Sequence, residues 1–326
     1  MSSPPDATPE SRALGALLGA LVGDAAGATL EFLGRGVEPA DVERALGMQG
    51  GGVLGTAPGQ ITDDGELTLC LAQGLDDGPY EPERVATGYA RWLDSGPFDV
   101  GIATGRALGA RPLAGQSVAE AMRAGARANL TSKANGSVMR AVPLAIWGAR
   151  RSPEEVAAAV HADATLSHPN PACRFAGVAY VLAIRHLLLR AGDVDGAVAA
   201  ARASVEAPEA VEVSGWLEEA LAGGDPGYAP NIGFVRLGFQ HAFRHLAQGS
   251  TYEAALRETL AGGGDTDTNA CIVGGLSGAL HGVDGIPARM REAVLECDTA
   301  RGRPRPDWLS SRQVPALVRR LLGGLA

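Results

Sequence analysis

Residues 13–32 read ALGALLGALVGDAAGATLEF, an apolar segment in which glycine recurs at every fourth position. A glycine inside a helix costs about 1 kcal/mol relative to alanine, so several on one face indicate that a second backbone passes very close. The same spacing returns in GGLSGALHG at residues 274–282. The two segments predict two helices that pack tightly in the centre of the protein. The glycines concerned are Gly15, Gly19, Gly23, Gly27, Gly274, Gly278 and Gly282.

Two short acidic clusters lie at expected helix starts: ITDDGEL at residues 61–67 and GGGDTDTNA at residues 262–270. In the first, Thr62 is a residue type that begins helices, and Glu66 behind it resembles part of a capping box. In the second, three glycines permit a tight turn before an apolar helix. Carboxylate and hydroxyl oxygens suit hard cations, and neither cluster has His or Cys in a ligand position. Together the clusters predict a metal site divided between two distant parts of the chain.

These acidic clusters also have a purely structural interpretation, in which Asp and Thr only cap helices. For either cluster alone this interpretation is at least as good as a metal site, but for both together we favour the metal site. Glu31 continues the four-residue series of glycines, so close helix packing would bring it to the same pocket. For Asp24, near the same face, the sequence leaves two possibilities open: a role in the site, or a buried acid bonded to a neighbouring helix end.

Most of the remaining chain is predicted to form helices joined by short loops rich in Gly and Pro. Because no repeated strand-like alternation is present, the predicted fold class is all-α. We expect residues 1–10 to be a disordered tail and residues 11–326 to form a single domain, since no linker divides them. The further helices that we expect span residues 85–93, 118–128, 153–161, 172–189, 197–205, 234–246, 252–260 and 315–322.

The composition is that of a globular protein with ample core material, since 46% of its 326 residues are hydrophobic and 20% are charged. The formal net charge is −9 and the basic residues are spread along the chain, which argues against a nucleic-acid or anionic-membrane surface. Four separated cysteines without a CxxC pair favour a reduced, cytoplasmic setting. The apolar run at residues 13–22 has about half of the ~20 residues that a membrane span needs, so we expect a buried helix and no membrane partner.

The chain resembles the ADP-ribosylglycohydrolase family, and is most similar to its bacterial dinitrogenase reductase-activating members, which remove ADP-ribose from arginine. The resemblance runs in order through nearly the whole chain. Its most specific parts are the TDD and GDTDT segments of the two acidic clusters. The segments that carry it are ALGALLGALVGDAAGATLEF, PGQITDDGELTLCLAQ, ARWLDSGPFDVG, NGSVMRAVPLA and GGDTDTNACIVGGLSGALHGVDGIP.

This resemblance implies a compact orthogonal multi-helix bundle around a central binuclear site with two divalent cations, Mg²⁺ or Mn²⁺. The implied reaction is cleavage of an N-glycosidic bond of ADP-ribose, which passes through oxocarbenium character and needs a carboxylate near the leaving nitrogen or the attacking water. Asp99 matches a residue proposed for that role in the bacterial enzymes, and Glu31 holds the position favoured in other branches. Asp99 alternatively caps the next helix. The residues that match the family's metal ligands are Glu31, Thr62, Asp63, Asp64, Asp265, Asp267 and Thr268.

The resemblance also implies a binding region for ADP-ribose. Asn135, Gly136 and Ser137 offer donors for a diphosphate or ribose, and His168 matches a histidine close to the substrate. As a single histidine beside prolines, His168 equally suits a structural turn. For Tyr228, core packing is the better interpretation than stacking on the ligand.

Three positions depart from the bacterial pattern. Gly65, Ile102 and Leu130 stand where polar or acidic residues are expected, so the metal chemistry transfers better than the substrate specificity. We predict a metal-dependent hydrolase that releases ADP-ribose from a protein modified on arginine. Two main alternatives stay open: the same fold acting on another ADP-ribose linkage (serine, a nucleic-acid base or a metabolite), or a non-catalytic ADP-ribose-binding protein. A binuclear phosphohydrolase is a more remote alternative.

Overall fold

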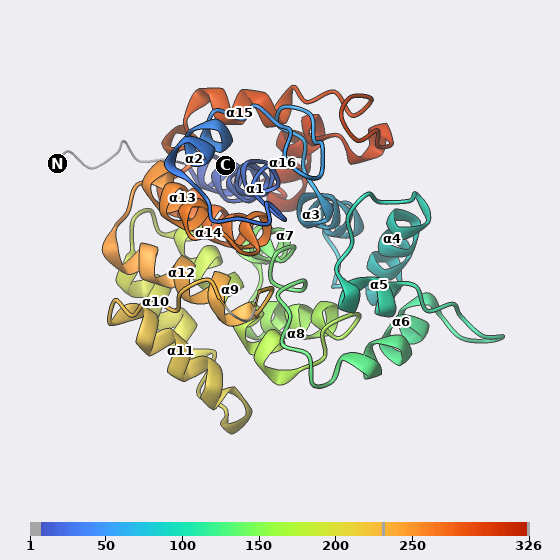
Figure 1. Ribbon diagram of the computed structural model, residues 1–326. Coiled ribbons are helices and arrows are strands. Elements are labelled where there is room, and N and C mark those ends of the chain that lie inside the picture. Colours follow the sequence, from blue (N-terminus) through green and yellow to red (C-terminus); the bar gives the residue numbers. More distant parts are fainter. Residues whose placement is uncertain (1–7, 230–231, 325–326) are drawn as a thin grey trace.

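The computed structural model describes residues 8–229 and 232–324, and within them the chain forms sixteen α-helices and six short 3₁₀ segments but no β-strand (Figure 1). The all-α prediction is confirmed. The helices are α1 (Pro9–Gly27), α2 (Pro39–Leu46), α3 (Asp63–Gly74), α4 (Pro82–Asp94), α5 (Ile102–Leu108), α6 (Val118–Ala126), α7 (Val142–Trp147), α8 (Pro153–Ala164), α9 (Pro171–Leu189), α10 (Val194–Ala203), α11 (Val211–Leu221), α12 (Val235–Gln248), α13 (Tyr252–Ala261), α14 (Thr266–His281), α15 (Ala288–Leu295) and α16 (Val314–Leu322).

Helices α1 and α14 pack backbone to backbone at the centre of the fold, as the glycine spacing predicts. At each of the four glycines of α1, an added Cβ would lie closer than 3.0 Å to a carbonyl oxygen of α14. The reverse holds for Gly274 and Gly278, which face carbonyl oxygens of α1. Gly282 differs from the expectation because it lies beyond the end of α14 with a φ of 67°, where glycine ends the helix. Two glycine stripes therefore set the distance between the helices that frame the site.

Neighbouring helices add tyrosine contacts to this central pair. The Tyr252 hydroxyl of α13 donates to the carbonyl oxygen of Gly19 at 2.7 Å, and the Tyr180 hydroxyl of α9 donates to that of Ile272 at 2.8 Å. By length and composition alone α9 could cross a membrane, but 72% of its apolar window is buried inside the protein, as in a core helix. Tyr180 and Tyr252 are both almost fully buried and stabilise the packing around α14.

The chain enters α1 earlier than the sequence analysis predicts. Pro9 and Glu10, assigned to a disordered tail, belong to the first turn of α1, whose N-cap Thr8 accepts a hydrogen bond from the amide of Ser11 at 3.2 Å. A proline at the first helical position and a Thr cap explain this start. Residues 1–7 lie outside the described residues, and the assignment of residues 11–326 to a single domain stays a prediction.

Helices α2, α5, α7, α11 and α15 were not expected. Four of them have only six to eight residues, so they hold too few turns for a clear helical period. The expected helices all exist, with ends that differ by a few residues. Among the short ones, α5 and α7 matter for function because the loops before them enter the site.

Candidate active site

The first turn of α3 is hydrogen-bonded to the carboxylate of Asp24, a residue of α1. The backbone amides of Thr62 and Gly65 donate to this carboxylate at 3.0 and 2.9 Å, and the Thr62 hydroxyl donates to it at 2.8 Å. Asp24 therefore caps α3 from another helix, which confirms its interpretation as a buried acid bonded to a helix end. Burial raises its pKa to about 7 although these hydrogen bonds lower it. This cap fixes the first turn of α3 against α1.

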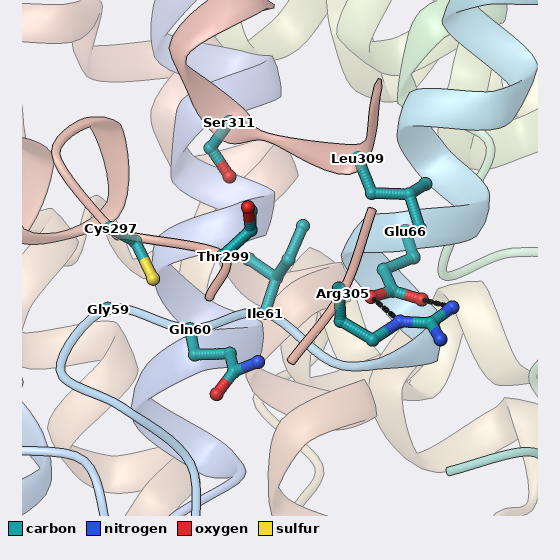
Figure 2. Close-up of a pocket in the computed structure, with 9 residues that line it drawn as sticks. All are labelled: Gly59, Gln60, Ile61, Glu66, Cys297, Thr299, Arg305, Leu309 and Ser311. Carbon is teal, nitrogen blue, oxygen red and sulfur yellow. Dashed lines mark hydrogen bonds and ion pairs between the residues drawn. The ribbon is translucent and has the colours of Figure 1, made fainter. Parts of the chain in front are cut away.

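Glu66 does not form the capping box that the sequence suggests. It is the fourth residue of the helix, and its carboxylate points to Arg305, whose Nε and Nη2 donate to it at 2.7 and 2.9 Å (Figure 2). Trp92 Nε1 donates to the same carboxylate at 2.6 Å. Arg305 also donates to the carbonyl oxygens of Ser95 and Gly96 at 3.1 and 2.9 Å. The C-terminal segment thereby ties α3 to the end of α4 and to the loop that follows it.

That loop carries Asp99. The guanidinium of Arg303 lies over the ring of Phe98 at 5.3 Å, and the amide of Gly101 donates to Asp63 Oδ2 at 3.4 Å. The loop is thus held between the C-terminal segment and the start of α3. Asp99 does not cap α5, because the N-cap there is Gly101. Its side chain is half-buried, and burial raises its pKa above the ordinary range.

Carboxylates from three distant segments meet at one place. The start of α3 brings Asp63 and Asp64, the start of α14 brings Asp265 and Asp267, and the turn after α1 brings Glu31. Backbone hydrogen bonds continue from the helix into this turn, among them one from the amide of Glu31 to the carbonyl oxygen of Gly27 at 3.2 Å. One oxygen each of Glu31, Asp265 and Asp267 lies within 4.8 Å of the other two. The two acidic clusters and Glu31 therefore come together, as the sequence predicts, whereas a metal bound between them stays a prediction.

The charge and hydrogen bonding of this cluster fit hard cations. Within the described part of the chain, the buried oxygens Glu31 Oε2 and Asp64 Oδ1 have no hydrogen-bond partner. Burial, followed by repulsion between the carboxylates, raises the pKa of Glu31 to about 8 and those of Asp63, Asp64 and Asp267 well above their ordinary values. Orphaned oxygens and raised pKa values are the features expected of a carboxylate set that can bind cations.

A pocket of about 490 Å³ opens beside the cluster. Its volume is in the range of small-molecule sites. Two residues expected at the site do not line it: Thr62 is fully buried with its hydroxyl on Asp24, and Ser137 is buried with a hydroxyl that lacks a hydrogen-bond partner in the described residues. The expected residues that do line it are Glu31, Asp63, Asp64, Asp99, Asn135, Gly136, His168, Asp265, Asp267 and Thr268.

Asn135, Gly136 and His168 line another part of the pocket wall. Asn135 Nδ2 donates to Asp265 Oδ2 at 2.7 Å, and its backbone amide donates to the carbonyl oxygen of Gly233 at 3.1 Å. A Cβ at Gly136 would lie 2.7 Å from His168 Cε1, so only glycine fits there. The side-chain amide of Asn135 therefore orients the carboxylate of Asp265. The absence of a side chain at Gly136 leaves room for the imidazole of His168 to reach the pocket.

Comparison with known proteins identifies the family to which the chain belongs. The sequence profile of the ADP-ribosylglycohydrolase family matches residues 5–324. The chain belongs to the ADP-ribosylglycohydrolase family. It is 30% identical over 278 residues to the ADP-ribosyl dinitrogen reductase glycohydrolase of Rhodospirillum rubrum, covering 85% of this chain and 88% of that one. It is also 30% identical over 300 residues to an ADP-ribosylarginine hydrolase of Pseudomonas putida (strain GB-1), covering 88% and 76%.

A solved structure supports the same assignment. An ADP-ribosylglycohydrolase-related protein complex superposes with a TM-score of 0.72 at 26% sequence identity, covering 98% of this chain and 99% of that one. Family membership makes the chain an enzyme of the ADP-ribosylglycohydrolase class, as the resemblance implies. The carboxylate cluster lies where the TDD and GDTDT segments, the most specific parts of the resemblance, come together.

Several pocket residues were missed by the sequence analysis. Arg106 of α5 is the one Arg or Lys among the described residues that line the pocket. Asn129 Nδ2 joins two parts of the wall by donating to the carbonyl oxygens of Ala103 and Ser167 at 2.8 and 2.9 Å. Phe32 follows Glu31 with a positive φ of 58° and stands 60% exposed at the rim. Arg106 lies on the short helix that follows the Asp99 loop, which is a signal that could have found it, but nothing in the sequence singles out Asn129.

Tyr228, Ile102 and Leu130 lie outside the carboxylate cluster. Tyr228 stacks on His241 with ring centroids 4.2 Å apart and covers Gly262, in the glycine run before Asp265. Tyr228 therefore packs against protein groups and does not line the pocket, although it is only partly buried and lies outside the hydrophobic core. Of the positions that depart from the bacterial pattern, Ile102 is 83% exposed at the pocket rim, whereas Leu130 is exposed outside the pocket lining.

Proposed function

We propose that this protein is a divalent-metal-dependent hydrolase that cleaves the N-glycosidic bond between ADP-ribose and an arginine side chain of a modified protein. The observation that carries the proposal is the carboxylate cluster with two orphaned buried oxygens beside a pocket of about 490 Å³. The activities printed in the names of the two bacterial relatives support the arginine linkage. The oxygen-only donor set supports Mg²⁺ or Mn²⁺, because softer metals more often take His or Cys.

The cluster residues would hold two cations, and bound cations supply Lewis-acid charge stabilisation and a grip on ribose hydroxyls. The candidate ligands are Glu31, Asp63, Asp64, Asp265 and Asp267 with Thr268, and Thr62 through the free lone pairs of its hydroxyl. The carboxylate of Asp24 accepts hydrogen bonds from Thr62 and Gly65, so we assign it the role of holding the first turn of α3 in place.

Asp99 is our candidate for the proton transfer. In the reaction the bond from the anomeric carbon to the guanidine nitrogen breaks, water oxygen bonds to that carbon, and a proton from the water ends on the departing nitrogen. A carboxyl group with a raised pKa can hold and pass on such a proton near neutral pH. The half-buried position and raised pKa of Asp99 support this role, and Glu31, with a pKa near 8 before metal binding, is the second candidate.

Cleavage of a different ADP-ribose linkage is the alternative to the arginine linkage. The exposed Ile102 stands at the pocket rim where a polar residue is expected, so a polar contact to the leaving group is missing there. The same chemistry would serve an ADP-ribose linked to serine, to a nucleic-acid base or to a metabolite. Four cysteines that form no disulfide support our further proposal of a cytoplasmic enzyme.

The test is release of ADP-ribose from an arginine-ADP-ribosylated protein in the presence of Mg²⁺, Mn²⁺ or a chelator. We would compare the native chain with Asp63→Asn and Asp265→Asn, and use Asp195→Asn on the exposed side of α10 as the matched control. Metal-dependent release that both site variants lose and the control keeps would support the proposal. Bound ADP-ribose without release would refute the arginine linkage and direct attention to the other linkages, then to a binding-only role.

A further inference from the structure

His168 stands at the end of a chain of buried hydrogen bonds that starts at Arg140. Arg140 Nη2 donates to Ser167 Oγ at 2.9 Å, and Ser167 Oγ lies 2.8 Å from His168 Nδ1. The exposed fractions of these three residues are 0%, 0% and 1%. Arg140 is fixed in turn, because its Nε pairs with Asp163 Oδ2 at 3.1 Å and its Nη1 donates to the carbonyl oxygen of Gly136 at 2.9 Å. One guanidinium therefore holds both the histidine chain and the glycine turn of the pocket wall.

The direction of the hydrogen bonds in this chain follows from the donors that each group has. A guanidinium can only donate, so Ser167 Oγ is the acceptor for Arg140. The serine hydroxyl proton then needs an acceptor, and His168 Nδ1 is the one within hydrogen-bond distance among the described residues. If Nδ1 itself carried a proton, two donors would point at Ser167 Oγ and its hydroxyl proton would stay buried and unpaired, which is unfavourable. The complete pairing leaves Nδ1 unprotonated.

We propose that Arg140 and Ser167 fix His168 as the neutral Nε2–H tautomer, which offers one hydrogen-bond donor to an acceptor oxygen of the bound ligand. His168 lines the pocket, and its Nε2 has no partner among the described residues. Burial, and then the charge of Arg140, lowers the pKa of His168 to about 3, in agreement with a neutral ring. Arg140 and Ser167 are positioning residues, and His168 is the contact.

A neutral donor suits this pocket for an electrostatic reason. A charged imidazolium would be attracted to the carboxylate cluster, whereas a neutral Nε2–H can bind a phosphate or hydroxyl oxygen without that competition. In this role His168 takes no part in proton transfer, which is left to the carboxylates. That the oxygen belongs to ADP-ribose rests on the proposed function, but the tautomer itself does not.

The direct test is nitrogen-15 NMR of the six histidines in the ligand-free protein, with His168 assigned by the signal that His168→Gln removes. Long-range proton–nitrogen correlations distinguish a protonated ring nitrogen from an unprotonated one. The expected result is a protonated Nε2 and an unprotonated Nδ1 at neutral pH. A protonated Nδ1 would overturn the proposal.

The second test compares two variants that each lose a buried serine hydroxyl. Ser167→Ala removes the donor to Nδ1, so we expect about tenfold weaker ADP-ribose binding with little change in kcat, and a His168 spectrum with mixed tautomers. Ser277→Ala is the control, because the Ser277 hydroxyl is also buried but lacks a hydrogen-bond partner in the described residues. Native affinity in a folded Ser167→Ala protein would contradict our inference. If the native protein does not bind ADP-ribose at all, the proposed function fails, and the spectrum alone decides the tautomer.

Discussion

A single methyl group at Gly23 tests the packing that holds the two halves of the site together. Gly23 lies in the middle of the α1 contact with α14, and a Cβ added there would stand 2.0 Å from the carbonyl oxygen of Ala270, where real Cβ atoms stay beyond about 3.0 Å. The atom met is backbone, so no side chain can turn away. The helices would have to separate by about 1 Å at this point.

Two opposing effects set the size of the change in stability for Gly23→Ala. Replacing glycine by alanine inside a helix favours folding by about 1 kcal/mol. Overpacking a rigid core costs about 3 kcal/mol or more when only backbone can move. The free energy of unfolding should therefore fall by about 2 kcal/mol. Because Glu31 follows α1 and Asp265 begins α14, the same displacement should weaken cation binding.

Urea unfolding followed by circular dichroism measures the first effect, and Mn²⁺ binding the second. Gly215→Ala is the matched control, because Gly215 lies in α11 and a Cβ there would meet no atom within 4 Å. The control should be slightly more stable than the native protein. If Gly23→Ala unfolds at the native midpoint with native Mn²⁺ affinity, the close backbone approach is refuted.

Three further predictions concern the groups around the cluster. Arg305→Met leaves Glu66 buried without its charged partner and should cost about 3–5 kcal/mol by urea unfolding; a loss below 1 kcal/mol would contradict the role of this ion pair. Asp24→Ala should cost about 2 kcal/mol and abolish activity, because three donors at the start of α3 lose their acceptor, and native activity would show that the cap is dispensable. In chelator, the contribution of Glu31 to thermal stability should be full near pH 4 and be lost as the pH rises toward 8, because folded Glu31 keeps a proton that the unfolded chain releases. Mg²⁺ or Mn²⁺ should remove this loss, and the same pH dependence in Glu31→Gln as in the native protein would refute the raised pKa.

Local residue patterns predicted much of the fold and about half of the site. Glycine at every fourth position has few explanations other than a close backbone contact, and Asp63, Asp64, Asp265 and Asp267 stand at helix starts that local sequence marks. Both signals depend on neighbours within one or two helical turns. For that reason they could be read without knowing how the chain folds.

Other site features depend on pairings that no local pattern encodes. Thr62 and Glu66 have the types expected for a capping box, yet Asp24 from α1 provides the cap and Arg305, 239 residues away, takes the glutamate. Asn129 crosses the wall of the pocket by bonds to two separate segments. A hydrogen bond between distant residues leaves no trace in the spacing of either partner.

The sequence by itself determined an all-α chain with two glycine-striped helices and two acidic helix starts, because helix periodicity and turn chemistry are local properties. Only the tertiary structure decided that the Thr62 hydroxyl bonds Asp24, that Ser137 does not line the pocket, and that Arg140 reaches His168 through Ser167. The physical reason is that side-chain direction at a site is set by contacts across the packed helices, and these form only when the whole chain is folded.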